Sequence, residues 1–296
     1  MVKFGVMTFG YGASPSQNQK FKDNGFISIN LGDYMQTLAV RNAYKHLGIA
    51  DSDIIDIDRD ALPGYGGPPV KLVMNGCFYD WCFPLPEAIT PTFIGFQAQP
   101  AVIAKHIEAL RPYQPIGCRD EATAEALARH GVEAFVSGCL TLTFPARPEA
   151  PAKGKAFIVY GDGAGALPNE VLRHIPPEIL ATAEWVHQRK LMHEIPLSET
   201  GRRYAEDHAR HLLATYRAQA NLIITPLHHA AAPCAATGIP VVICRRGYSA
   251  RFSTLRHILP YYEAGDIAAI DWHPEAVDLS AHKQKAFQQL ATALGI

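Results

Sequence analysis

The sequence has little that points to disulfide bonds or to a metal site. Its 296 residues include six cysteines, which form no Cys-x-x-Cys pair, and its 13 histidines show no His-Glu-x-x-His or similar ligand spacing. Most of the cysteines lie in apolar, strand-like stretches, a pattern that favours free buried thiols over disulfides or bound zinc. We therefore predict a protein that holds no metal.

A long hydrophobic run and an excess of one charge are also missing. No apolar stretch reaches the roughly 20 residues that a membrane-spanning helix needs, and Met1–Met7 is too short and interrupted for a signal peptide. The net charge of −1 gives no overall field that would attract nucleic acid or an anionic membrane surface. We expect a cytoplasmic protein with no transmembrane segment and no nucleic-acid partner, and a peripheral position at the inner membrane stays open.

Short apolar runs alternate with helical patterns along the chain. Lys3–Thr8 and Ala156–Tyr160 each begin such a series, and the proline-rich segment Pro145–Gly154 separates the two. The alternation predicts an α/β fold of two Rossmann-like domains that face a cleft. The expected parts are an N-terminal domain over residues 1–146, a C-terminal domain over residues 154–275, and a helical segment over residues 276–296 placed to pack back across them.

The stretch Asn221–Ile243 contains the most informative pattern of the chain. Two short, continuous apolar runs, Leu222–Ile224 and Val241–Ile243, have the pattern of parallel strands buried on both faces. His228 and His229 follow the first run, so they are expected at the carboxyl edge of the sheet, where open α/β folds bind ligands. Position alone does not separate the two histidines, and a simple turn- or helix-capping role remains an alternative.

A second candidate lies near the N-terminus, where Asn30-Leu31-Gly32-Asp33 leads into a helical pattern. Asp33 is predicted as the N-cap of that helix. Asn30 and Gly32 allow a tight turn and a close approach to a ligand, and a helix N-terminus offers free N–H groups to an anion. A turn plus a cap without further function is the alternative. The preceding segment Gly10–Gly25 has the composition of a mobile loop.

Arginines at strand ends point to an anionic ligand. Arg119 and Asp120 follow a strand and precede a helix, and a guanidinium binds carboxylate or phosphate through two hydrogen bonds. A local Arg119–Asp120 salt bridge is the alternative. Arg245, Arg246 and Arg251 form a basic loop after the strand that ends near Ile243, which favours an anion over a neutral ligand.

Several of these motifs, taken in order, resemble the polysaccharide pyruvyl transferase family. Asn30–Gln36 is similar to its N-terminal Asn-x-Gly-Asp signature, and Gly117–Asp120 is similar to its Gly-x-Arg-Asp segment. Thr225–His228, followed by small residues and Gly238-Ile239-Pro240, resembles its Arg-Leu-His and Gly-x-Pro segment. The similarity runs over most of the chain, from the first domain to about Ile243.

The resemblance implies a GT-B-like fold and a defined reaction. Members transfer the pyruvyl unit of phosphoenolpyruvate onto sugar hydroxyls, usually as a cyclic ketal on a cell-surface polysaccharide or its lipid-linked precursor. Phosphoenolpyruvate would be a co-substrate, and no cofactor is implied. The family's histidine corresponds to His228 and its arginine to Arg119. Pro226 departs from the pattern, because many members carry arginine there, so an anion contact would be lost or supplied by Arg245, Arg246 or Arg251.

These arguments together predict the site residues. His228 is expected to act as acid and base, and Asp33 to orient the acceptor hydroxyls. The residues expected to bind substrate are Asn30, Gly32, Arg119, Asp120, His229, Arg245, Arg246 and Arg251. Two alternatives remain: a GT-B-like glycosyltransferase that uses a nucleotide sugar, with Gly161–Gly165 and the arginine loop at the diphosphate, and a non-catalytic carbohydrate-binding partner.

Overall fold

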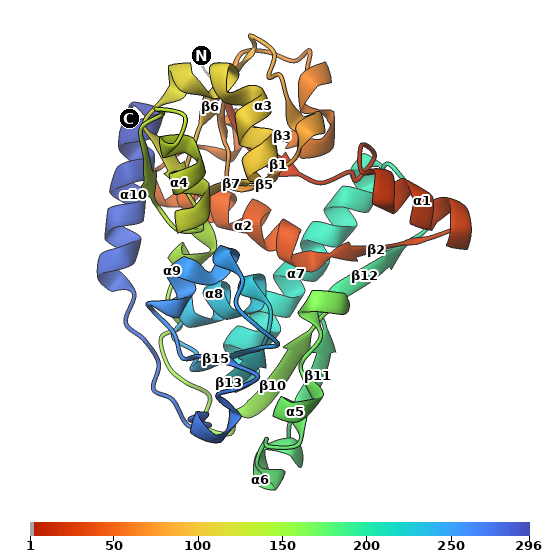
Figure 1. Ribbon diagram of the computed structural model, residues 1–296, viewed down its shortest axis with the longest axis vertical. Helices are drawn as coiled ribbons and strands as arrows, with labels where there is room; N and C mark the ends of the chain where they lie inside the picture. Colours follow the sequence, from red (N-terminus) through yellow and green to blue (C-terminus); the bar gives the residue numbers. More distant parts are fainter. Residues whose placement is uncertain (1–2) are drawn as a thin grey trace.

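Parallel strands form the centre of both halves of the chain in the computed structural model, which describes residues 3–296 (Figure 1). In the first half, one sheet has the order β3-β1-β4-β6 and a second has the order β5-β7-β8-β9. The chain runs directly from β4 into β5 and from β6 into β7, so these two sheets are continuous. Backbone hydrogen bonds from Met74 N–H to Thr92 C=O (2.8 Å) and from Gly76 N–H to Gly95 C=O (3.1 Å) extend the pairing of the two segments across the junction. The strands are β1 (Lys3–Thr8), β3 (Ile54–Asp58), β4 (Val70–Val73), β5 (Gly76–Phe78), β6 (Ile89–Thr92), β7 (Phe96–Ala98), β8 (Ile116–Cys118) and β9 (Ala134–Val136).

The second half is built on one five-stranded parallel sheet in the order β11-β10-β13-β14-β15. β10 therefore lies between β11 and β13, and the chain adds strands first on one side of β10 and then on the other. Open α/β sheets bind ligands at the carboxyl ends of strands beside such a switch point. The strands are β10 (Lys155–Tyr160), β11 (Glu184–His187), β13 (Ala220–Thr225), β14 (Val241–Arg245) and β15 (Tyr261–Glu263).

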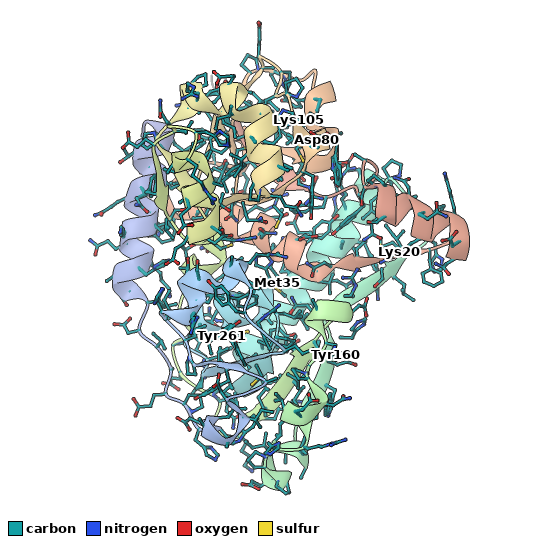
Figure 2. The ribbon with its side chains drawn as sticks, in the orientation of Figure 1. Lys20, Met35, Asp80, Lys105, Tyr160 and Tyr261 are labelled. Atoms are coloured by element: carbon teal, nitrogen blue, oxygen red, sulfur yellow. The ribbon has the colours of Figure 1, made fainter. Side chains whose placement is uncertain are left out.

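A short antiparallel ribbon joins the two halves. β2 (Ile27–Asn30) pairs with β12 (Arg189–Met192), so Asn30 lies opposite Arg189. The helix that follows β2, α2 (Leu31–His46), packs on α7 (Glu199–Gln219). Apolar side chains from both halves share one core there, and Met35, near the middle of the molecule in Figure 2, belongs to it. This shared core fixes the N-terminus of α2 relative to the second sheet.

The central stretch Asn221–Ile243 folds as the sequence predicts. Its first apolar run is β13, and its second is β14. The small residues between them form α8 (His228–Ala236), which is buried along its whole length and packs against both strands. Alanine and cysteine side chains allow the helix to approach the sheet closely, which explains why this stretch has few large residues.

Two local predictions near the N-terminus are wrong. Asn30, not Asp33, is the N-cap of α2, because its Oδ1 accepts a hydrogen bond from Gly32 N–H at 3.0 Å. Asp33 lies in the first turn. The segment expected to be a mobile loop contains α1 (Pro15–Asn24), with Ser14 as its N-cap and Gly25 ending it at φ +74°. The serine, proline and glycine that suggested a loop are the residues that begin and end this helix.

The last helix returns to the first half of the molecule (Figure 1). Leu290 and Leu294 are fully buried against Val6, Val73 and α2. No helix within residues 3–296 has the length and apolar character needed to cross a membrane. The remaining helices are α3 (Pro100–Leu110), α4 (Glu121–Ala128), α5 (Asn169–Leu172), α6 (Pro177–Leu180), α9 (Ser253–Arg256) and α10 (Ser280–Leu294).

Candidate functional site

A cavity of about 220 Å³ opens at the carboxyl edge of the five-stranded sheet, beside its switch point. The turn after β10, the turn after β13 and the loop after β14 form most of its wall, and the N-cap of α2 adds a wall from the first half of the chain. The cavity therefore lies where the two halves meet. Its lining residues are Asn30, Gly161, Asp162, Ala164, Gly165, Gln188, Arg189, Pro226, Leu227, His228, His229, Arg245, Ser249, Arg251 and Phe252.

His228 is the first residue of α8 and presents a neutral imidazole to this cavity. Its side chain is 6% exposed, and its ring packs edge-on against Phe252 with the centroids 5.4 Å apart. Burial, followed by the charges of His229 and Arg119, holds the pKa of His228 well below 6.5. Nδ1 has no hydrogen-bond partner among residues 3–296. A neutral imidazole in the wall of a polar cavity can take up a proton and deliver it again.

His229 is held in place by both halves of the chain. Its backbone oxygen accepts a hydrogen bond from Gln188 Nε2 at 3.2 Å, and its Nε2 lies 3.7 Å from Cys139 Sγ. A Cβ at Gly32 would lie 2.8 Å from His229 Cβ. The close approach that the sequence suggested for Gly32 is thus to His229, and this contact explains the need for glycine there. Burial lowers the pKa of His229 well below 6.5 as well.

Asn30 lines the cavity, whereas Asp33 lies behind it. Asp33 Oδ2 accepts a hydrogen bond from the Tyr11 hydroxyl at 2.9 Å, and Oδ1 accepts one from Asn30 Nδ2 at 3.3 Å. Burial raises the pKa of Asp33, and the positive charge of Arg59 opposes that rise. Asp33 is not among the residues that form the described cavity wall. Its contact with the cavity is indirect, through Asn30.

The three arginines at the end of β14 and in the loop after it differ in position: Arg245, which ends the strand, and Arg251 line the cavity, and Arg246 does not. Arg245 lines the cavity, donates a hydrogen bond from Nη1 to the Pro226 carbonyl, and stacks its guanidinium 4.3 Å from the centre of the Phe252 ring. Its Nε finds no acceptor within the described part of the chain. Arg251 also lines the cavity. Arg246 is exposed and does not belong to the described wall, so the structure does not place it at the site.

Arg119 and Asp120 are not among the residues of the described cavity wall. Arg119 is fully buried and donates from Nη2 to Gln97 Oε1 at 2.9 Å and to Cys77 Sγ at 3.2 Å. Asp120 Oδ1 caps α4 by accepting from Thr123 N–H at 2.9 Å. The two residues approach only to 3.9 Å, beyond hydrogen-bond distance. Asp120 therefore has a structural role as a helix cap, and the prediction that it binds substrate is not supported by its position.

Two polar wall residues, Gln188 and Arg189, were not predicted from the sequence. Asp162 Oδ2 lies 2.9 Å from Arg189 Nε, and Arg189 also donates to Ser28 Oγ at 2.9 Å. Gln188 reaches the site through its bond to the backbone of α8. The sequence predicts the Gly161–Gly165 turn, which contains Asp162, as a diphosphate-binding element of the alternative glycosyltransferase. Gln188 and Arg189 belong to no such motif, and only the pairing of β12 with β2 brings them to the cavity. No group of three potential metal ligands is arranged around a common point in the part of the chain that the structure describes.

The two buried histidines predict a pH dependence of stability. Their folded-state pKa values lie below the ordinary 6.5, so the unfolded chain binds more protons as the pH falls past 6.5. The free energy of unfolding should therefore decrease between about pH 7.5 and about pH 5.5, and the decrease should be smaller in His228→Asn and His229→Asn. Urea unfolding of each protein at both pH values measures this. Equal pH dependence in wild type and both variants would show that the histidines are not buried as neutral groups.

The fold and the site together define the class of protein. Parallel sheets that present histidines and arginines at their carboxyl ends are suited to binding and transforming an anionic ligand. Residues 30–248 match the sequence profile of the family described as polysaccharide pyruvyl transferase, and the chain belongs to that family. It is therefore a transferase of the pyruvyl-transfer class that acts on polysaccharides. The matched stretch includes every predicted site residue except Arg251.

Solved structures give weaker likenesses. A functionally uncharacterized protein from Klebsiella pneumoniae subsp. pneumoniae NTUH-K2044 is 11% identical with a TM-score of 0.44, over 86% of this chain and 88% of that one. An alpha,alpha-trehalose 6-phosphate synthase from Burkholderia multivorans is 12% identical with a TM-score of 0.34, over 89% of this chain and 71% of that one. Neither likeness bears on activity at these values. No curated protein matches the sequence.

Proposed function

We propose that this protein transfers the pyruvyl unit of phosphoenolpyruvate to two hydroxyls of a sugar, forming a cyclic ketal on a cell-surface polysaccharide or its lipid-linked precursor. The observation that carries the proposal is the neutral His228 imidazole in one small cavity with Arg245 and Arg251; the third arginine of the wall, Arg189, is paired with Asp162. Phosphoenolpyruvate has a carboxylate and a phosphate, which two guanidinium groups can bind separately. The cavity of about 220 Å³ is smaller than the roughly 300–1,000 Å³ of sites for drug-sized ligands, as a small donor requires.

The position of Arg245 supports this assignment. The sequence has Pro226 where the resemblance implies an arginine, and Arg245 donates to the Pro226 carbonyl from the neighbouring strand. Its guanidinium therefore stands next to the place where an arginine side chain would otherwise begin. We infer that Arg245 supplies the anion contact that Pro226 cannot make.

The chemistry requires protons to move in a defined order. Protonation of the methylene carbon of the donor makes C2 electron-poor, two sugar oxygens form bonds to C2, and the bond from C2 to the phosphate oxygen breaks. One of the two hydroxyl protons balances the proton gained by the methylene carbon, and the other leaves with phosphate. His228 lines the cavity as a neutral imidazole and is placed to accept a hydroxyl proton and pass it to the methylene carbon. Asp33 is a positioning residue in this scheme, since it holds the Asn30 side chain.

We further propose that the two sets of parallel strands belong to two Rossmann-like domains in a GT-B-like arrangement. The supporting observation is that β1 lies between β3 and β4 much as β10 lies between β11 and β13. In this division residues 1–146 carry the acceptor side and residues 154–275 the donor side. Residues 276–296 then form a segment whose helix packs on the first domain.

The experiment that tests the function is incubation of the purified protein with phosphoenolpyruvate and candidate lipid-linked or nucleotide-linked sugars. Release of phosphate together with a sugar product heavier by one pyruvyl unit supports the proposal. A glycosyltransferase is the second candidate, because the Gly161–Gly165 turn lines the cavity as a diphosphate-binding turn would. It predicts nucleotide release from a sugar nucleotide instead. Sugar binding without turnover of either donor would identify a non-catalytic carbohydrate-binding protein.

A further inference from the structure

Cys77 differs from the other cysteines of the chain. All six lie in the described region, and Cys77, in β5, is the one that is partly exposed, whereas the other five are buried. Burial raises the pKa of the Cys82 and Cys244 thiols to about 12, and it also raises the pKa values of the remaining buried thiols. A buried thiol of this kind is inert. Cys77 is therefore the most accessible of the described thiols.

Two arginines from opposite halves of the chain meet at the Cys77 sulfur. Arg119 Nη2 lies 3.2 Å from Sγ, and Arg251 Nη2 lies 3.5 Å from it. Arg119 is fully buried, and its Nε and Nη1 have no hydrogen-bond acceptor anywhere in residues 3–296. Arg251 also lines the cavity, so this pair of guanidinium groups is continuous with the candidate site. A cationic pair with unsatisfied donors is a site for an anion with more acceptor atoms than one sulfur.

The charged groups around Cys77 together lower the pKa of its thiol. Burial opposes ionisation, but Arg119 and Arg251 together outweigh it and hold the pKa of Cys77 below 9.0. The negative charge of Asp33 acts in the opposite direction and raises the pKa of Cys77. Burial raises the pKa of Tyr79 to about 12, so its phenol is uncharged near neutral pH. Arg59 donates to the Cys77 carbonyl at 3.3 Å, and its own charge is paired with Asp60 at 3.0 Å.

We propose that the Cys77 sulfur occupies an anion position between Arg119 and Arg251, and that an incoming phosphate or carboxylate displaces it there, the ionised fraction of the sulfur taking up a proton from the solvent. No covalent bond forms. In the absence of ligand the sulfur competes for this position and keeps the two guanidinium groups oriented. The inference rests on the proposed function only for the identity of the physiological anion.

The proposal is tested by alkylation of the folded protein with iodoacetamide. This reagent forms an S–C bond with the thiolate and releases iodide. Peptide mass spectrometry should find Cys77 labelled first, and the other five cysteines labelled only after unfolding. Inorganic phosphate should slow the labelling of Cys77 by at least roughly threefold. At a pH below the pKa of Cys77, a rise of one unit in that pKa reduces the thiolate fraction about tenfold. The remaining thiolate is about threefold more nucleophilic, so the labelling rate falls by roughly threefold in total.

Two arginine variants provide the matched comparison. Arg251→Gln removes one of the two cations and should slow labelling by a similar factor without phosphate. Arg256→Gln, in the neighbouring helix α9, should leave the rate unchanged, since Arg256 stacks on Tyr248 and Tyr261 and not on Cys77. Unchanged labelling in Arg251→Gln, first labelling of another cysteine, or no effect of phosphate would each overturn the proposal.

A binding measurement separates competition from a structural role. Cys77→Ala removes the competitor, so inorganic phosphate should bind more tightly than to wild type, by a margin that grows with pH, in isothermal titration calorimetry. Equal or weaker phosphate binding at all pH values would contradict the inference. These experiments need no phosphoenolpyruvate, so their outcome is independent of the proposed function. The anion site between Arg119 and Arg251 can be confirmed even if no pyruvyl transfer is found, and it can be refuted even if the protein turns over phosphoenolpyruvate.

Discussion

Replacement of His228 by alanine should lower kcat for pyruvyl transfer by about 10²–10⁴-fold, the usual contribution of a general acid–base group. The side chain is 6% exposed, lies in the cavity wall, and has an unpaired Nδ1 within the described structure. Because burial keeps the imidazole neutral below pH 6.5, it enters the reaction as a proton acceptor. The donor's negative charges would then stabilise its protonated form.

The measurement is initial-rate kinetics of phosphate release at saturating phosphoenolpyruvate. His211→Ala is the matched control, since His211 is exposed on α7, away from the cavity, and its loss should leave kcat unchanged. Removal of a buried ring can also lower stability, so thermal unfolding must show that His228→Ala is folded at the assay temperature. Turnover close to wild type by a folded His228→Ala protein would refute the assignment.

Replacement of Arg245 by glutamine should raise the KM for phosphoenolpyruvate, with a smaller effect on kcat. A hydrogen bond to a charged group contributes about 1.5–3 kcal/mol, which corresponds to roughly a 10–100-fold loss of affinity at about 1.4 kcal/mol for each factor of ten. Arg245 lines the cavity, its Nε is unpaired among the described residues, and Pro226 beside it cannot contact an anion through its side chain. An interaction made equally in ground and transition states changes KM more than kcat.

Arg246→Gln is the control for this prediction. Arg246 is adjacent in sequence but exposed and outside the cavity wall, so its replacement should change KM little. The comparison also decides between two arginines that the sequence could not distinguish. A KM that rises equally in both variants would show that the loop acts through its overall charge, and an unchanged KM in Arg245→Gln would remove Arg245 from the donor site.

Local patterns in the sequence determined much of the fold. Continuous apolar runs identified β1 with its observed bounds and β10, β13 and β14 to within two residues at each end. Such runs identify buried parallel strands because both faces of each strand are covered, and no tertiary knowledge is needed to see them. The same reasoning placed His228 and His229 at the carboxyl edge of a sheet, where the cavity is found.

Capping residues were harder to assign from the sequence. Asn30 and Asp33 are both good N-caps, and the choice depends on where β2 ends. β2 ends at Asn30 because its partner strand β12, some 160 residues later in the chain, begins pairing there, at Arg189. The missed helix α1 has the same explanation, since serine, proline and glycine mark either a loop or the two ends of a short helix.

Tertiary structure alone decided which charged and polar side chains share the site. The sequence by itself determined the strand ends, the histidine pair and the basic loop, because these depend on neighbours along the chain. It did not determine that Arg245 and Arg251 face the cavity while Arg246 faces solvent, nor that Arg119 lies buried against Cys77. The cavity depends on the packing of one half against the other, which brings Arg251 to Cys77 across 174 positions, and the Arg119 contact depends on the pairing of strands 42 positions apart within the first half. In both cases residues distant in the sequence meet, and burial then shifts their pKa values.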